Sequence, residues 1–121
     1  MPKSKKLTSK PTKWYMQLDQ DEVNAALEEA TVDAYDLEEQ HTGLFHAVAE
    51  EMKFPWQGSA LGETLTVVDA AMPDDNGLGL DIVVERQGKQ YRVDAGSVEL
   101  LKPFPEGHLY LAAYLSWRKT L

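Results

Sequence analysis

A chain of 121 residues with a formal net charge of −8 has the size of one domain and an acidity that disfavours nucleic acid as its main partner. It contains no cysteine, which excludes disulfides, thiolate metal ligands and cysteine nucleophiles, and which suits a reducing, cytoplasmic location. Hydrophobic residues make up 43% of the chain, enough for a core, yet no apolar run approaches the roughly 20 residues that span a bilayer.

Residues 1–18 are predicted to form a basic, flexible N-terminal arm. Its basic residues are Lys3, Lys5, Lys6, Lys10 and Lys13. No apolar stretch follows them, so the composition indicates a solubilising tail and not a signal peptide, with a weak nucleic-acid or membrane contact as the alternative. The arm ends in an apolar cluster that we expect to pack on the domain, formed by Trp14, Tyr15, Met16 and Leu18.

Residues 19–53 have the periodicity of helix. Asp19 can cap a helix, and Glu22 stands where it would complete a capping box. Two apolar stripes follow at steps of three and four; they are Val23, Ala26, Leu27 and Ala30, then Ala34, Leu37, His41, Leu44, Val48 and Met52. The poorer helix formers between the stripes predict two helices, about 20–31 and 34–52, or one long kinked helix. Gly43 within the second stripe indicates close approach of a neighbouring backbone.

The same segment concentrates the negative charge of the chain. From Asp19 to Glu51 there is no Lys or Arg, and the eleven carboxylates are Asp19, Asp21, Glu22, Glu28, Glu29, Asp33, Asp36, Glu38, Glu39, Glu50 and Glu51. Like charges this close repel each other and destabilise a fold unless water and salt, a basic partner or a bound cation neutralises them.

Residues 54–104 change to β character. The Phe54–Gly58 stretch breaks the helix, and strands are predicted over about 61–68, 78–85 and 90–93. Turns are predicted at Asp74-Asp75-Asn76-Gly77 and at Gln87-Gly88-Lys89, and a one-turn 3₁₀ element over 94–99 leads to Leu100. Several short strands joined by tight turns predict a small antiparallel barrel.

Residues 105–119 are predicted to form a C-terminal helix, with Pro105 in its first turn and two cations, Arg118 and Lys119, in its last. The whole order predicts an α+β fold. We therefore expect a single domain over 19–121, helical over 19–53, a β-barrel over 54–104 and helical again over 105–119.

A cation-binding role is suggested by the joint between the two acidic helices. Asp33, Asp36, Glu39 and Gln40 follow each other at helical spacing, so one face could gather several carboxyl oxygens. Calcium takes roughly six to eight oxygen ligands and needs no nitrogen or sulfur. Irregular backbone between Thr31 and Asp36 could add carbonyl oxygens. The alternative is a solvated acidic face, because helical carboxylates alone seldom close a calcium site.

Two other patterns are interpreted as structural. Asp74–Glu85 mimics an EF-hand loop, but Leu78 at its fifth place cannot ligate and the flanks predict strands, so we interpret it as a β-hairpin turn. His41 and His46 are five apart and diverge on a helix, which does not suit a zinc pair. His41 is interpreted as a hydrogen-bonded core residue. No combination of side chains predicts a catalytic site, and we expect a protein that is not an enzyme.

Longer motifs run through the domain. Tyr35–Phe45 leads through Glu50-Glu51-Met52 into Phe54-Pro55-Trp56, Val84-Glu85-Arg86 leads through Gly88-Lys89 to Tyr91-Arg92-Val93, and Tyr114-Leu115-Ser116-Trp117 follows near the end. Over about residues 33–118 these motifs resemble the small bacterial calcium-binding protein family first known from cyanobacteria. Trp56 stands where that family more often has Phe, and the basic arm has no counterpart in it.

The resemblance implies acidic helices on an SH3-like barrel, and calcium bound by an acidic patch. Asp36, Glu38 and Glu39 match the acidic start of the family motif, and Asp33 is added on charge alone, so these four are the predicted metal ligands. The implied role is sequestration, buffering or sensing of calcium ions in the bacterial cytoplasm. The alternative is a protein interaction module that presents the acidic helices to a basic partner without specific metal binding, and such a contact would be weakened by salt.

Overall fold

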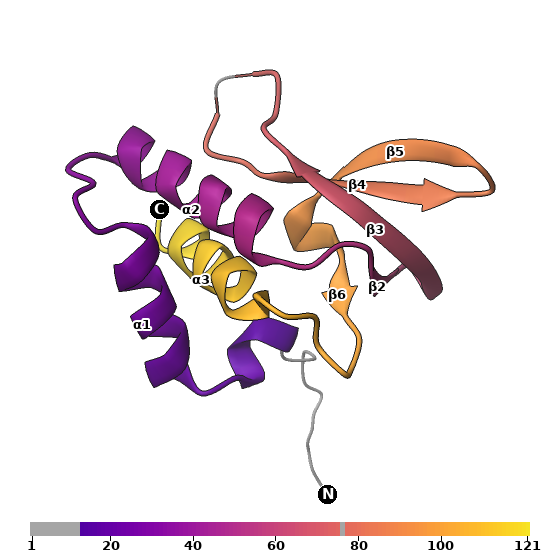
Figure 1. Ribbon diagram of the computed structural model, residues 1–121, viewed down its shortest axis with the longest axis horizontal. Helices are drawn as coiled ribbons and strands as arrows, with labels where there is room; N and C mark the ends of the chain where they lie inside the picture. Colours follow the sequence, from indigo (N-terminus) through magenta and orange to yellow (C-terminus); the bar gives the residue numbers. More distant parts are fainter. Residues whose placement is uncertain (1–12, 76) are drawn as a thin grey trace, which may run out of the picture.

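The computed structural model describes residues 13–75 and 77–121. In chain order its elements are the 3₁₀ turn η1 (Trp14–Gln17), α1 (Gln20–Ala30), α2 (Leu37–Glu51), β2 (Trp56–Ala60), β3 (Glu63–Ala71), β4 (Asp81–Arg86), β5 (Lys89–Asp94), the 3₁₀ turn η2 (Ala95–Ser97), β6 (Glu99–Leu100) and α3 (His108–Lys119). The helices gather at one end of the molecule and the sheet at the other (Figure 1). The predicted α+β class is confirmed.

The acidic segment forms two helices and not one. Asp19 caps α1 as predicted, and its side chain accepts a hydrogen bond from the backbone N–H of Asp21. The second helix begins at Leu37, three residues later than the predicted start at 34. The reason is local, because Asp33 adopts the left-handed region at φ 66° and Asp36 is extended. Residues 31–36 are therefore a loop that reverses the chain between α1 and α2.

The strand predicted over about 61–68 is found as β3, but it begins at Glu63, because Leu61 and Gly62 make a two-residue turn at φ 52° and 79°. The strand before this turn, β2, was not predicted. Leu61 lies fully exposed at the tip of this hairpin. The other hairpin turn, at Gln87 and Gly88 between β4 and β5, lies where it was predicted.

All strand pairs are antiparallel, and the order in the described sheet is β5-β4-β3-β2-β6. The sheet is not closed: β5 and β6 are its two end strands, so the closed barrel expected from the strand pattern is not formed. The 3₁₀ turn η2 lies where it was expected, directly before β6. The open sheet leaves strand edges and hollows that a closed barrel would have buried.

Helix α3 joins the layers, since it lies between α1 and α2 (Figure 1) and packs on both. It begins at His108, not at 105, and the backbone N–H of His108 bonds the carbonyl of Pro105. Its central residues are buried, which are Leu111, Ala112, Ala113, Tyr114, Leu115 and Trp117. Within residues 13–75 and 77–121, no helix is long and apolar enough to cross a membrane.

The end of the predicted arm belongs to the fold. Trp14 is buried in the core, and its backbone N–H donates to Glu99 Oε1 at 3.1 Å. Its ring packs against Phe104, with 5.7 Å between ring centroids. The predicted packing of this cluster is thus confirmed for Trp14, Tyr15 and Leu18, whereas Met16 is exposed. Residues 1–12 of the predicted arm lie outside the described residues, and the boundary at residue 18 stays a prediction.

Candidate functional site

The joint between α1 and α2 forms an open hollow of about 470 Å³. Three of the four predicted ligands, Asp33, Glu38 and Glu39, line it. The remaining lining residues are Ala30, Val32, Ala34, Thr42 and Gly43. Asp36 is not among them. The loop and the first turns of α2 therefore bring three carboxylates from one short stretch of sequence around one depression.

Two of the predicted ligands cap helix α2. Asp36 Oδ1 accepts the backbone N–H of Glu39 at 2.8 Å, and Glu39 Oε1 accepts the backbone N–H of Tyr35 at 2.9 Å. The first bond satisfies an N–H group that a helix start leaves without a partner, and the second satisfies the N–H of the residue just before the cap. Carboxylates there also face the positive end of the helix dipole. Each keeps a second carboxyl oxygen outside these two bonds.

Asp33 and Glu38 do not cap the helix. Neither makes a hydrogen bond or ion pair within the described part of the chain. All four predicted ligands are exposed. No three acidic or histidine side chains among the described residues lie close enough together to hold a metal ion as they stand. The donor chemistry thus fits calcium, which accepts oxygen ligands in irregular geometry, while the side chains would have to turn inwards to meet it.

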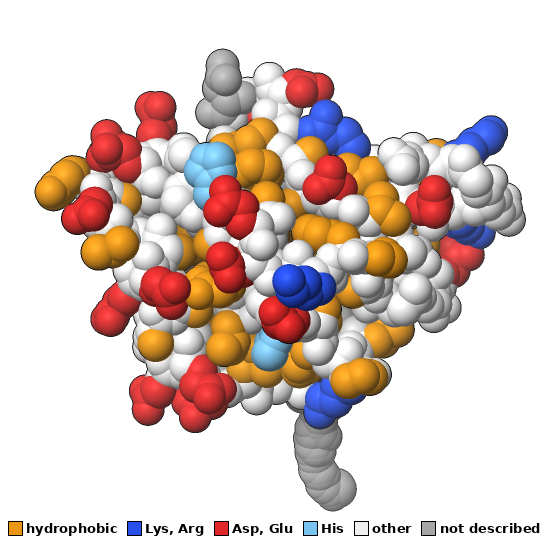
Figure 2. Space-filling model, in the orientation of Figure 1, with side chains coloured by type: hydrophobic (Ala, Val, Ile, Leu, Met, Phe, Trp, Pro, Cys, Tyr) orange, Lys and Arg blue, Asp and Glu red, His pale blue; other side chains and the backbone are white. Residues whose placement is uncertain are grey.

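The electrostatic setting favours a cation. Every one of the eleven carboxylates of the acidic segment is exposed. Among the described residues none of them pairs with Lys or Arg, and Glu50 contacts only His46, at 3.7 Å. Figure 2 shows these acidic side chains spread over the helical end of the molecule, with most of the visible Lys and Arg elsewhere. A negative field of this extent raises the local concentration of cations.

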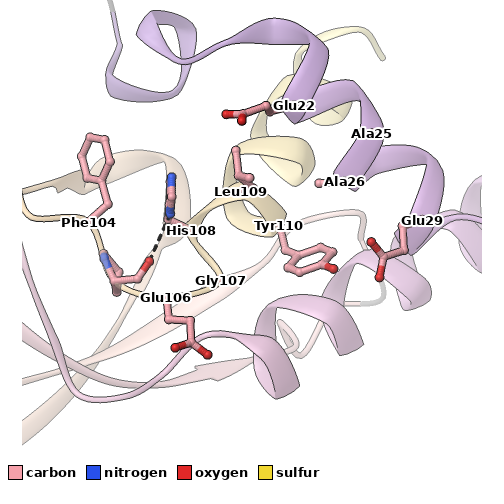
Figure 3. A pocket seen from close by; sticks show the side chains of 11 residues that line it. Glu22, Ala25, Ala26, Glu29, Phe104, Glu106, Gly107, His108, Leu109 and Tyr110 are labelled. Carbon is pink, nitrogen blue, oxygen red and sulfur yellow. Dashed lines mark hydrogen bonds between the residues drawn. The ribbon is translucent and has the colours of Figure 1, made fainter.

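A second acidic hollow, of about 540 Å³, lies between α1 and the start of α3. Figure 3 shows Glu22 and Glu29 of α1 on one side of it, with His108 and Tyr110 of α3 on the other. Partial burial and the Glu29 carboxylate raise the pKa of Tyr110, so its hydroxyl stays protonated. This hollow holds carboxylates like those of the joint, so it serves as a comparison for it.

The EF-hand look-alike is a loop between β3 and β4, as interpreted from the sequence. Arg92 contacts two acidic residues of this motif. Its guanidinium lies 3.7 Å from Asp74, 3.6 Å from Asp81, and bonds the carbonyl of Met72. Two of the acidic residues of the motif are thus neutralised by an internal positive charge, and the loop is structural.

The histidines also have structural roles. His41 is buried, its Nε2 lies within hydrogen-bonding distance of the Gly79 carbonyl, and its ring stacks on Trp117 at an interplanar angle of 18°. His46 is exposed on another side of α2. The interpretation of His41 as a hydrogen-bonded core residue is confirmed.

Two features of the site were missed by sequence reasoning. Thr42 lines the hollow one helical turn after Glu38, and the i, i+4 spacing could have placed it there. Trp117 Nε1 donates to Gln40 Oε1 at 2.8 Å, which links the residue after Glu39 to the buried face of α3. That second contact joins residues far apart in sequence, and no local pattern shows it.

The fold has neighbours among solved structures. The crystal structure of Anabaena CcbP matches with a TM-score of 0.67 and 23% identity, covering 84% of this chain and 92% of that one. A calcium-binding protein in its calcium-binding form matches with a TM-score of 0.64 and 21% identity, covering 90% of this chain and 97% of that one. No protein-family model and no curated protein sequence matches. The resemblance predicted from the motifs is confirmed as a shared fold.

Proposed function

We propose that this protein binds calcium ions without catalysis, at the hollow between α1 and α2. The observation that carries the proposal is that Asp33, Glu38 and Glu39 surround one depression at a helix joint, with no positive charge paired to them in the described residues. The fold is shared with a protein solved in a calcium-binding form, which supports the same chemistry here. A cytoplasmic role in calcium sequestration or buffering fits exposed, unpaired ligands.

The four carboxylates contribute differently in this proposal. Asp33 and Glu38 can offer both oxygens, because neither makes a hydrogen bond or ion pair within residues 13–75 and 77–121. Glu39 offers its second carboxyl oxygen, Oε2, because Oε1 accepts from Tyr35. Asp36 acts chiefly by capping the start of α2. Backbone carbonyls of the 31–36 loop are further oxygen donors. A bound calcium ion would supply two positive charges where like charges repel.

Calorimetric titration of calcium tests the site. The variant Asp33→Asn with Glu38→Gln removes two charges but no described hydrogen bond, and is expected to weaken binding about tenfold or more, since ligand charge tunes calcium affinity. The control variant Glu22→Gln with Glu29→Gln removes the same charge from the other acidic hollow. This control should change the calcium affinity far less. If the wild type gives no heat of calcium binding, the proposal is contradicted. If the control loses more affinity than the Asp33→Asn with Glu38→Gln variant, the ion binds at the other hollow.

Trp117 provides an independent readout. Its indole N–H bonds Gln40, which adjoins Glu39, so ordering of the first turns of α2 by calcium should change its fluorescence. The variant Trp117→Phe separates this signal from those of Trp14 and Trp56. Magnesium at the same concentration should produce a smaller change, because it needs a stricter octahedral geometry.

The acidic surface also supports a second candidate, contact with a basic protein partner. Its eleven exposed carboxylates without Lys or Arg partners in the described residues favour it. This candidate predicts binding that falls steeply with salt and is equally reduced by the two double variants above. If calcium binds at the α1–α2 joint, the two double variants should instead lower the calcium affinity by different amounts.

A further inference from the structure

A groove of about 530 Å³ lies on a different part of the surface from the acidic joint. It is formed where the linker from α2 to β2 meets the loop from β6 to α3, and the backbone N–H of Lys53 bonds the carbonyl of Glu106 across this meeting at 3.2 Å. Its lining combines two lysines, Lys53 and Lys102, with an apolar part made of Pro55, Trp56, Leu101, Pro103 and Pro105.

The local charge of this groove is opposite to that of the molecule. Lys53 and Lys102 are exposed and form no ion pair within residues 13–75 and 77–121, and Glu106 is the single acidic residue of the lining. Lys13 lies 4.0 Å from Glu99 Oε2, so these two charges offset each other. Since charges are screened within about 8 Å at physiological ionic strength, a ligand in the groove meets Lys53 and Lys102 more than the carboxylates of the α1–α2 joint.

Two buried hydrogen-bond donors lie near this groove. Trp56 is 6% exposed and Trp14 is 5% exposed, and within the described part of the chain no acceptor bonds the Nε1 of either. Trp56 lines the groove, and Trp14 lines a neighbouring hollow of about 280 Å³; Lys102 borders both. Figure 1 shows the β6–α3 loop running beside η1, in keeping with the contact between Trp14 and Phe104. Because Trp56 lines the groove, its indole N–H resonance can report on a ligand bound there.

We propose that this groove binds an extended acidic segment of a partner protein. Apolar side chains of the segment pack on Leu101 and the proline lining, and its carboxylates pair with Lys53 and Lys102. A peptide fits better than a nucleic acid, because the Trp56 ring is too buried for bases to stack on its face. The proposal is independent of calcium binding at the α1–α2 joint.

The test uses the full chain labelled with nitrogen-15 and a synthetic peptide of alternating glutamate and leucine, capped at both ends, with EDTA present. Saturable binding that shifts the Trp56 indole resonance, assigned with Trp56→Phe, is the expected result. The variant Lys53→Glu with Lys102→Glu should weaken binding at least tenfold. The control Lys89→Glu changes an exposed lysine on the distant β4–β5 hairpin, also unpaired among the described residues, and should leave binding within about twofold.

Three results would overturn the proposal. One is no binding of the peptide at millimolar concentration. Another is an equal loss in the Lys89→Glu control and the double variant, which would show unspecific charge attraction. The third is tighter binding of a single-stranded oligonucleotide, or of a peptide with lysine in place of glutamate, at the same resonances. Addition of calcium should not change the peptide affinity, so failure here and failure of the calcium site are separate outcomes.

Discussion

At the scale of single residues, Gly43 shows how one missing side chain lets two helices meet. A Cβ atom on Gly43 would lie 2.3 Å from the carbonyl oxygen of Ala30, far inside van der Waals contact. The close approach predicted from this glycine in a helix is therefore confirmed. It also sets the shape of the hollow, because both residues line it.

We expect Gly43→Ala to destabilise the fold by about 1–3 kcal/mol, because forcing an extra carbon into a packed contact outweighs the gain in helix propensity. Urea unfolding measures the change. The control is Asn24→Ala at an exposed position of α1, which should stay within about 0.5 kcal/mol of the wild type. Equal stability of Gly43→Ala and the wild type would show that the helices can separate freely.

The buried side chain of Tyr114 should make the folded state less stable at alkaline pH. Burial, together with the negative charge of Asp94, raises the pKa of Tyr114 to about 12 from 10.0, against the opposing effect of Arg118. The folded state thus keeps a proton that the unfolded chain releases, so this contribution is complete below pH 10 and is lost as the pH rises towards 12. Its hydroxyl also donates to the carbonyl of Leu78 at 3.0 Å.

Urea unfolding on both sides of the unfolded tyrosine pKa checks this prediction. The loss of stability between about pH 9 and pH 11.5 should be smaller in Tyr114→Phe than in the wild type, since the variant has no proton to release. Tyr35→Phe serves as the control, because Tyr35 is 87% exposed and should leave the pH profile unchanged. Parallel profiles for all three proteins would contradict the prediction.

At the scale of elements, the start of α2 depends on the Asp36 and Glu39 caps. We expect Asp36→Ala to cost about 1 kcal/mol in unfolding free energy, and Asp36→Asn to cost much less, because asparagine is as good an N-cap as aspartate. Chemical denaturation measures both variants without calcium. This pair separates the capping role of Asp36 from its charge, and an equal loss in both would mean that the charge is what stabilises the helix start.

The turns show which elements a local pattern can predict. The hairpin at Gln87 and Gly88 and the cap at Asp19 were predicted because glycine and aspartate act on their immediate neighbours. The turn at Leu61 was missed, since leucine at a positive φ is uncommon and its β-prone neighbours suggested a continuous strand. Gly62 was the sequence signal that could have indicated this turn. The delayed start of α2 has a similar cause, with Asp33 taking the left-handed conformation.

At the scale of the whole molecule, the acidic helices should make stability depend on cations. Ions screen and bind the exposed carboxylates, so sodium chloride should raise the melting temperature gradually. Calcium should raise it by several degrees more at matched ionic strength, since a ligand that binds only the folded state stabilises it by mass action. Thermal melts with calcium, magnesium and sodium check this. Equal effects of calcium and magnesium at matched ionic strength would contradict a specific site.

The sequence by itself determined the class of the fold, the existence of the acidic helices and the carboxylate chemistry of their surface, because periodicity, capping and charge are local properties. Only the tertiary structure decided which carboxylates line one hollow. It placed Asp33, Glu38 and Glu39 there and assigned Asp36 to the helix cap. It also left the sheet open and placed Lys53 and Lys102 in one groove. Such contacts join residues far apart in the chain, and their geometry depends on how all the helices and strands pack together.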